Sequence, residues 1–168
     1  MPRIIVFDVN ETLLNVRVLE PLFEQVFGEK AALKEWFGLL LLHSEVATIA
    51  GPYFDFATIA RAALQMTAAV RQIPITRAQE DEILTGMSSL PPHPEVPAAL
   101  QMLKDEGLRL VTLTNNSARV VEAQMKNSGL ASYFERNFSV DEIRCFKPSR
   151  EAYGMVADQL GVKQRTSA

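Results

Sequence analysis

An apolar, β-branched run at residues 4–7 ends in a carboxylate, Asp8, and is followed by a polar turn. A short run of this composition predicts a buried strand of a parallel sheet. In open α/β sheets, ligands and reactive groups gather beyond the carboxyl ends of the strands. Asp8 is therefore predicted to lie at the functional edge of such a sheet.

The segment after this strand has a helical pattern. Its apolar spacing predicts helices at 18–27, 31–50, 56–70 and 77–87, with Thr76 as an N-cap. Gly51-Pro52 is expected to end the second of these helices. Four prolines within residues 91–97 then predict a stiff connection, which no continuous helix can cross.

Beyond the prolines, helical and extended patterns alternate. Helices are predicted at 98–106, 117–128 and 151–160, and strands at 108–113 and around 137–139. Such alternation is typical of a parallel sheet. We predict an α/β fold: a doubly wound, Rossmann-like core (residues 1–15 and 91–168) and an all-helical cap (residues 16–90) inserted after the first strand, where it would cover Asp8.

The composition restricts the partners. The net charge is −3 without a run of Lys or Arg, so no electrostatic footprint for nucleic acid or an anionic membrane is present, and a small-molecule substrate is expected. The longest later apolar block, 36–42, is too short to span a membrane. The single cysteine, Cys145, rules out an intrachain disulfide and fits a reducing, cytoplasmic location.

Two further strand ends carry polar groups. Thr114 and Asn115 follow the second predicted core strand, and Lys147 follows the third strand region. A hydroxyl and backbone N–H groups can hold an anion, and an ammonium group can neutralise Asp8. The ordinary alternatives are a helix N-cap near Asn116 or Ser117 and a solvated surface lysine.

These residues carry a resemblance to a known family. The stretches FDVNETL (7–13), LTNN (113–116) and FKP (146–148) resemble the first three motifs of the haloacid dehalogenase superfamily, most closely those of type II (S)-2-haloacid dehalogenases. The resemblance implies that Asp8 displaces halide to form an ester, which water hydrolyses. It further implies that Thr12 and Thr114 position the reacting groups, that Asn115 binds substrate, and that Lys147 stabilises the charge of Asp8.

Three other positions bear on substrate binding. Tyr153 matches a tyrosine of the dehalogenases, although a packing role is equally compatible with its helix. Asn10 stands where phosphatases of the superfamily have an acid and dehalogenases a tyrosine. Phe37 stands where the dehalogenases have a halide-binding arginine, and it supplies an apolar lining without charge. His43 or Arg61 are candidates for the missing cation.

These departures leave three functions open. A halide leaves without a proton, so Asn10 weakens a phosphatase assignment more than a dehalogenase assignment. We expect a hydrolase of short 2-haloacids that uses no metal and no cofactor. The alternatives are a small-molecule phosphatase, which would require Mg²⁺, and a catalytically impaired or binding-only member of the superfamily.

The C-terminal end differs from the superfamily pattern. Residues 161–168 are polar, without the strand that in the superfamily pairs beside the first one. The core strands at this end are therefore expected to be missing, and we predict a C-terminally truncated chain with its first strand at a sheet edge. Superfamily members often dimerise, which leaves a homodimer open.

Overall fold

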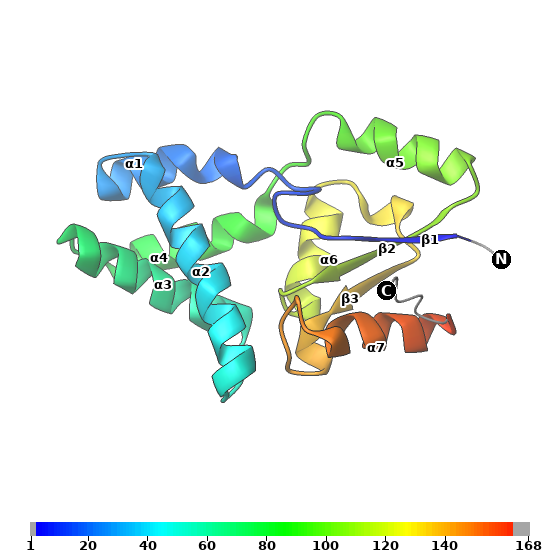
Figure 1. Ribbon diagram of the computed structural model, residues 1–168. Helices are drawn as coiled ribbons and strands as arrows, with labels where there is room; N and C mark the ends of the chain where they lie inside the picture. Colours follow the sequence, from blue (N-terminus) through cyan, green and yellow to red (C-terminus); the bar gives the residue numbers. More distant parts are fainter. Residues whose placement is uncertain (1–2, 163–168) are drawn as a thin grey trace.

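The computed structural model describes residues 3–162 and shows a small parallel sheet beside a group of helices (Figure 1). The strands are β1 (Ile4–Phe7), β2 (Arg109–Thr114) and β3 (Arg136–Ser139). Within the described residues they lie in the order β1-β2-β3, and both neighbouring pairs are parallel. The predicted α/β fold with a parallel sheet is confirmed.

The register brings the polar strand ends to one edge. Phe7 pairs with Thr112, so Asp8 comes one step later, close to the level at which β2 ends. Thr114, the last residue of β2, pairs with Ser139, the last residue of β3. Because all three strands run the same way, the groups that follow them face a common region.

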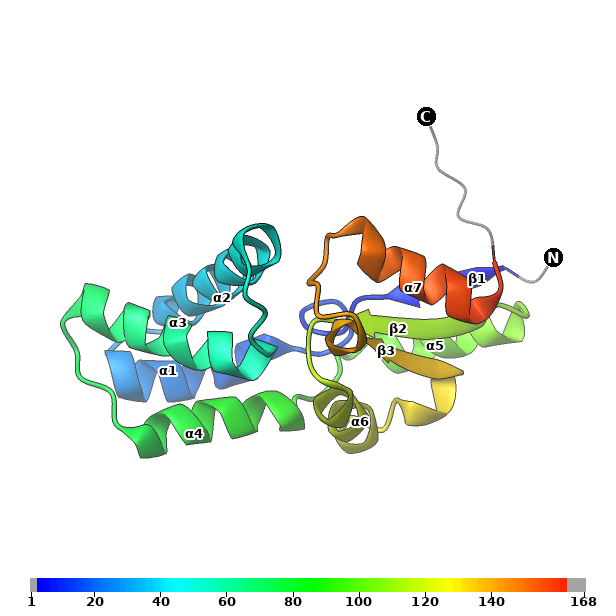
Figure 2. The ribbon, with the colours of Figure 1, turned by 90° about the horizontal axis from the view of Figure 1, so that it is seen from below.

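The described residues contain seven α-helices in addition to this sheet. Four follow β1: α1 (Glu20–Phe27), α2 (Ala31–Ala50), α3 (Phe56–Arg71) and α4 (Arg77–Gly86). Three belong to the alternating part: α5 (Val96–Asp105), α6 (Ala118–Asn127) and α7 (Arg150–Leu160). Figures 1 and 2 show α5 and α7 on opposite faces of the sheet, and α1–α4 as a group beyond the ends of the strands. Across residues 3–162, no helix combines the length and apolar character that a membrane crossing requires.

Local chemistry explains several helix boundaries. Thr76 caps α4 through a reciprocal capping box with Gln79, as its sequence predicts. Asp55 accepts the Thr58 N–H at the start of α3. Gly51 terminates α2, again as predicted. These signals are local, so they are visible in the sequence.

Two predicted helix starts were wrong by two residues. The segment predicted as a helix from residue 18 begins as a 3-10 turn, η1 (Val16–Leu19), and becomes α-helical only at Glu20. Pro21 explains this shift, because proline lacks an N–H and fits best in the first turn of a helix. The same rule places Pro97 in the first turn of α5, which begins at Val96 rather than at residue 98.

The two connections between the helical segment, defined here as residues 16–90, and the sheet run side by side. The Asn15 N–H donates to the Pro91 carbonyl at 2.9 Å, and the His93 N–H donates to the Leu13 carbonyl at 3.0 Å. The His93 Nε2 also lies 3.1 Å from the Glu11 carbonyl oxygen. The chain thus leaves the core and returns to it through one hydrogen-bonded crossing.

Trp36 is the centre of packing within the helical segment. Its side chain is fully buried, and its Nε1–H donates to the Ala60 carbonyl at 2.9 Å, which joins α2 to α3. The ring also packs on Phe23 of α1, with 5.2 Å between centroids. One indole therefore holds three helices together.

We predict that Trp36→Phe lowers the free energy of unfolding by about 1–3 kcal/mol, because it removes a buried hydrogen bond and leaves unfilled volume. Urea unfolding followed by circular dichroism measures this loss as a lower transition midpoint. A change below about 0.5 kcal/mol, the range of ordinary surface substitutions, would contradict the role assigned to the indole.

Candidate active site

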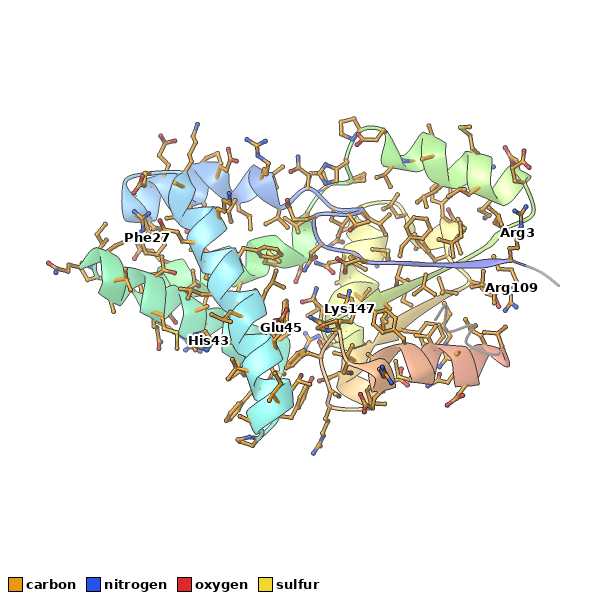
Figure 3. The ribbon with its side chains drawn as sticks, in the orientation of Figure 1. Arg3, Phe27, His43, Glu45, Arg109 and Lys147 are labelled. Carbon is orange, nitrogen blue, oxygen red and sulfur yellow. The ribbon has the colours of Figure 1, made fainter. Side chains whose placement is uncertain are left out.

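Lys147 lies near the ends of the strands (Figure 3), where it contacts Asp8. Its Nζ lies 2.5 Å from Asp8 Oδ1, and the Val9 N–H donates to the same oxygen at 2.8 Å. The Asp8 side chain is 49% exposed, whereas that of Lys147 is 15% exposed. Among the described residues, both of these hydrogen bonds go to Oδ1 and none goes to Oδ2 of Asp8.

The loop that carries Lys147 is fixed by the end of β2. The Lys147 ammonium group donates a second hydrogen bond to the Leu113 carbonyl at 2.8 Å. Its backbone N–H donates to Asn115 Oδ1 at 2.9 Å. These contacts hold the lysine in place from both ends of its side chain.

Thr114 is almost completely buried, and its Oγ1 accepts the Asn116 N–H at 3.2 Å. The hydroxyl therefore stabilises the turn after β2. Ser117 is the N-cap residue of α6 by position, although its side chain makes no capping hydrogen bond. These contacts correspond to the structural interpretation of the turn, and the predicted role of Thr114 in the reaction stays a prediction.

Two predicted site residues are exposed. Thr12 lies in the turn after Asp8, close to it in sequence. Tyr153 lies on α7 with 44% of its surface exposed, so it is not a core-packing residue. The predicted roles of both residues in the reaction stay predictions.

Asn10 is turned into the protein. Its Oδ1 accepts a hydrogen bond from Gln124 Nε2 at 3.0 Å, and only 9% of the residue is exposed. Gln124 is completely buried, and it also donates to the Met87 carbonyl at 2.7 Å and accepts from Asn116 Nδ2 at 3.2 Å. This one amide thus joins the loop after β1, the loop after β2 and the returning end of the helical segment.

The sequence gives no signal for Gln124. It occupies a helix in which polar residues are common, and periodicity alone does not distinguish a buried amide from an exposed one. Its burial on α6 between Val121 and Met125, together with its three partners, is known only from the structure.

Phe37 lies in a different hollow. A cavity of about 540 Å³ is lined by Phe37, Leu33, Val16 and Glu11, together with the basic side chains of Arg17, Lys30 and Lys34. Neither Asp8 nor Lys147 lines it. Glu11, which also lines this hollow, follows Asp8 by three residues in the sequence.

The two candidates for a replacement cation are placed differently. Arg61 donates to Glu80 and Asp81 at 2.7 Å each, and the hydrogen bond with Glu80 raises the pKa of its guanidinium group. Arg61 thus forms ion pairs with two residues of α4. His43 is half-buried on α2. Within residues 3–162, no group of three or more His, Cys, Asp or Glu side chains is arranged to hold a metal ion.

A parallel sheet that presents an aspartate and a lysine at its strand ends, with a helical insertion after the first strand, defines a class of hydrolases. A family model described as haloacid dehalogenase-like hydrolase matches residues 2–168, and the chain belongs to this family.

Individual relatives and solved structures show which members of the family the chain resembles. Haloacetate dehalogenase H-2 of Moraxella sp. (strain B) is 27% identical over 164 residues, which are 96% of this chain and 73% of that protein. The structure of L-2-haloacid dehalogenase from Xanthobacter autotrophicus matches with a TM-score of 0.89 and 27% identity, over 97% of this chain and 66% of that one. A structure of the Xanthobacter enzyme with covalently bound chloropropionic acid matches with a TM-score of 0.88, 26% identity and the same coverage. The chain thus spans about two thirds to three quarters of the length of these relatives.

We predict that Gln124→Met lowers the free energy of unfolding by about 2 kcal/mol or more, because the Asn10, Asn116 and Met87 groups lose a buried partner. Urea unfolding measures the change. Gln101→Met is the matched control: the Gln101 amide donates to Asp105 on the exposed face of α5, so its loss should cost less than about 0.5 kcal/mol. Equal effects of the two substitutions would contradict the role of Gln124.

Proposed function

We propose that the protein hydrolyses short 2-haloacids to 2-hydroxyacids and halide through an ester on Asp8. The observation that carries the proposal is the Asp8 carboxylate, which has one oxygen held by Lys147 and Val9 and the other free for attack. The ammonium group of Lys147 lies beside this carboxylate, and carboxylates are among the nucleophiles that form covalent intermediates. The covalent chloropropionic acid in the Xanthobacter relative supports the same chemistry.

The proposed reaction has two steps. In the first, Asp8 Oδ2 attacks C2 of the substrate, a C–O bond forms, and the carbon–halogen bond breaks with its electron pair on the halide. In-line attack inverts the configuration at C2. In the second, water adds to the ester carbonyl of Asp8, and the C–O bond to Asp8 Cγ breaks. The 2-hydroxyacid and one proton leave, and the carboxylate is restored.

Neighbouring groups have roles consistent with their positions. The Lys147 ammonium group would stabilise the carboxylate between turnovers. Asn115, half-buried after β2, would bind the substrate carboxylate, and Thr114 would maintain the turn that presents Asn115. We assign Thr12 and Tyr153 to the rim of the site.

The position of Asn10 favours halide over an alkoxide as leaving group. An alkoxide needs a proton from a general acid, whereas halide departs as a stable anion. The Asn10 amide cannot supply such a proton, and its oxygen is engaged by Gln124. This supports a 2-haloacid rather than a phosphoester as substrate, and no metal is required.

The helical segment would act as the cap, and the core would comprise residues 1–15 and 91–168. The segment lies beyond the ends of the strands (Figure 1), and Asp8 directly follows the end of β1. Phe37 would contribute an apolar surface to the hollow that it shares with Glu11, which neither Asp8 nor Lys147 lines. The free thiol of Cys145 supports a reducing location, the cytoplasm.

We predict that Asp8→Asn reduces halide release from (S)-2-chloropropionate by at least about a thousandfold, because the amide is a far weaker nucleophile. Ion chromatography measures the halide. Asp105→Asn, a substitution on the exposed face of α5, should keep the parent rate. Residual activity above about a tenth of the parent in a folded Asp8→Asn variant would remove Asp8 from this role. Mg²⁺-dependent phosphate release without halide release would instead favour a phosphatase.

We further predict that multiple turnovers in H₂¹⁸O place ¹⁸O in the Asp8 carboxylate, because water attacks the ester carbonyl of the enzyme. Mass spectrometry of the peptide that contains Asp8 detects this label. Hydroxyacid that carries ¹⁸O from the first turnover, with an unlabelled Asp8 peptide, would show direct attack of water on the substrate and exclude the ester.

A further inference from the structure

The residue before Lys147 is held by the helical segment. Phe146 is completely buried, and its ring packs between Tyr53 and Phe56, with centroid separations of 5.1 and 6.0 Å. Its backbone N–H donates to Thr48 Oγ1 at 3.0 Å. These three partners come from the end of α2, the connection to α3, and the start of α3.

A second contact fixes the beginning of the same loop. The Tyr53 hydroxyl donates to Asp141 Oδ1 at 2.5 Å, across 88 positions in the sequence. Burial of the phenol and this hydrogen bond raise the pKa of Tyr53, so the group remains a donor at neutral pH. Asp141 belongs to η4 (Val140–Glu142), which starts the loop that ends at Lys147.

The contacts at Phe146 act directly on Lys147, because a planar peptide joins the two residues and fixes their Cα atoms about 3.8 Å apart. On the core side, Lys147 is held by Asn115 and by the Leu113 carbonyl. Two parts of the protein therefore fix the position of the ammonium group that contacts Asp8. One is the sheet, and the other is the far end of the helical segment, defined here as residues 48–56.

We propose that Thr48 and Tyr53 are positioning residues for Lys147: the far end of the helical segment clamps Phe146 and thereby places the ammonium group beside Asp8. The consequence for turnover rests on the proposed function, whereas the placement of Lys147 does not. Departure of this end from the core would release Phe146 and loosen the lysine, which couples closure of the segment to the charge at the nucleophile.

The test measures the chemical accessibility of Lys147, which does not depend on substrate turnover. The 168-residue parent chain and its variants are treated with a limiting amount of an amine-acetylating reagent, and Lys147 acetylation is quantified by peptide mass spectrometry. Lys104, which donates to the Ser132 carbonyl on the far side of the core, serves as the internal reference. Thr48→Val and Tyr53→Phe should each accelerate Lys147 acetylation about 2- to 10-fold, the equivalent of one lost hydrogen bond.

Matched controls separate positioning from general loosening. Thr67→Val removes a buried hydroxyl that bonds only within α3, to the Ala63 carbonyl. It should not change Lys147 acetylation. Thr48→Ser, which keeps the acceptor for the Phe146 N–H, should restore the parent rate.

Two results would overturn the proposal: unchanged Lys147 acetylation in folded Tyr53→Phe and Thr48→Val, or an equal rise in Thr67→Val. If Thr48→Val does not fold, the conservative Tyr53→Phe variant decides alone. In halide-release assays the clamp variants should lower kcat with little change in KM. A parent protein that releases no halide would contradict the proposed function. The acetylation rates would still test whether Thr48 and Tyr53 position Lys147.

Discussion

The ion pair between Asp8 and Lys147 is the interaction on which the site depends. It joins residues 139 positions apart, and its 2.5 Å contact exists only because parallel strands deliver their following loops to one edge. The residue next to Asp8 cannot neutralise the carboxylate, because the Val9 N–H donates a hydrogen bond but carries no charge. The lysine supplies that charge, and its second hydrogen bond to the Leu113 carbonyl orients it without neutralising it.

The helical segment is fastened to the core at two separate places by polar contacts. Near the crossing, Gln124 binds the Met87 carbonyl, and at the far end Tyr53 binds Asp141. Apolar surfaces alone would permit sliding between the two parts, because dispersion contacts have little directional preference. Two hydrogen-bonded points, one buried and one partly buried, fix the relative orientation of the segment, including its rotation about the crossing.

The sequence was sufficient where the determining signal is local or periodic. The strand that leads to Asp8, the capping box at Thr76 and the alternation after residue 91 follow from short-range rules, and the fold follows from them. The same edge rule predicted that Lys147 would approach Asp8. Gln124 and the Tyr53–Asp141 contact were not predictable, because each depends on partners that only the tertiary fold brings together. Two helix starts were misplaced because apolar spacing was followed without the positional preference of proline.

The side-by-side connections at Asn15 and Pro91 have a consequence for how such chains diversify. The two ends of the helical segment lie within hydrogen-bonding distance of each other, and the strands that precede and follow it, β1 and β2, are paired with each other. Because the two connections meet in this way, the core does not constrain the length or shape of the helical segment between them. Replacement of the helical segment by one of different length would leave the β1–β2 pairing unchanged. Substrate specificity can therefore change with the helical segment, while the residues at the strand ends stay with the core.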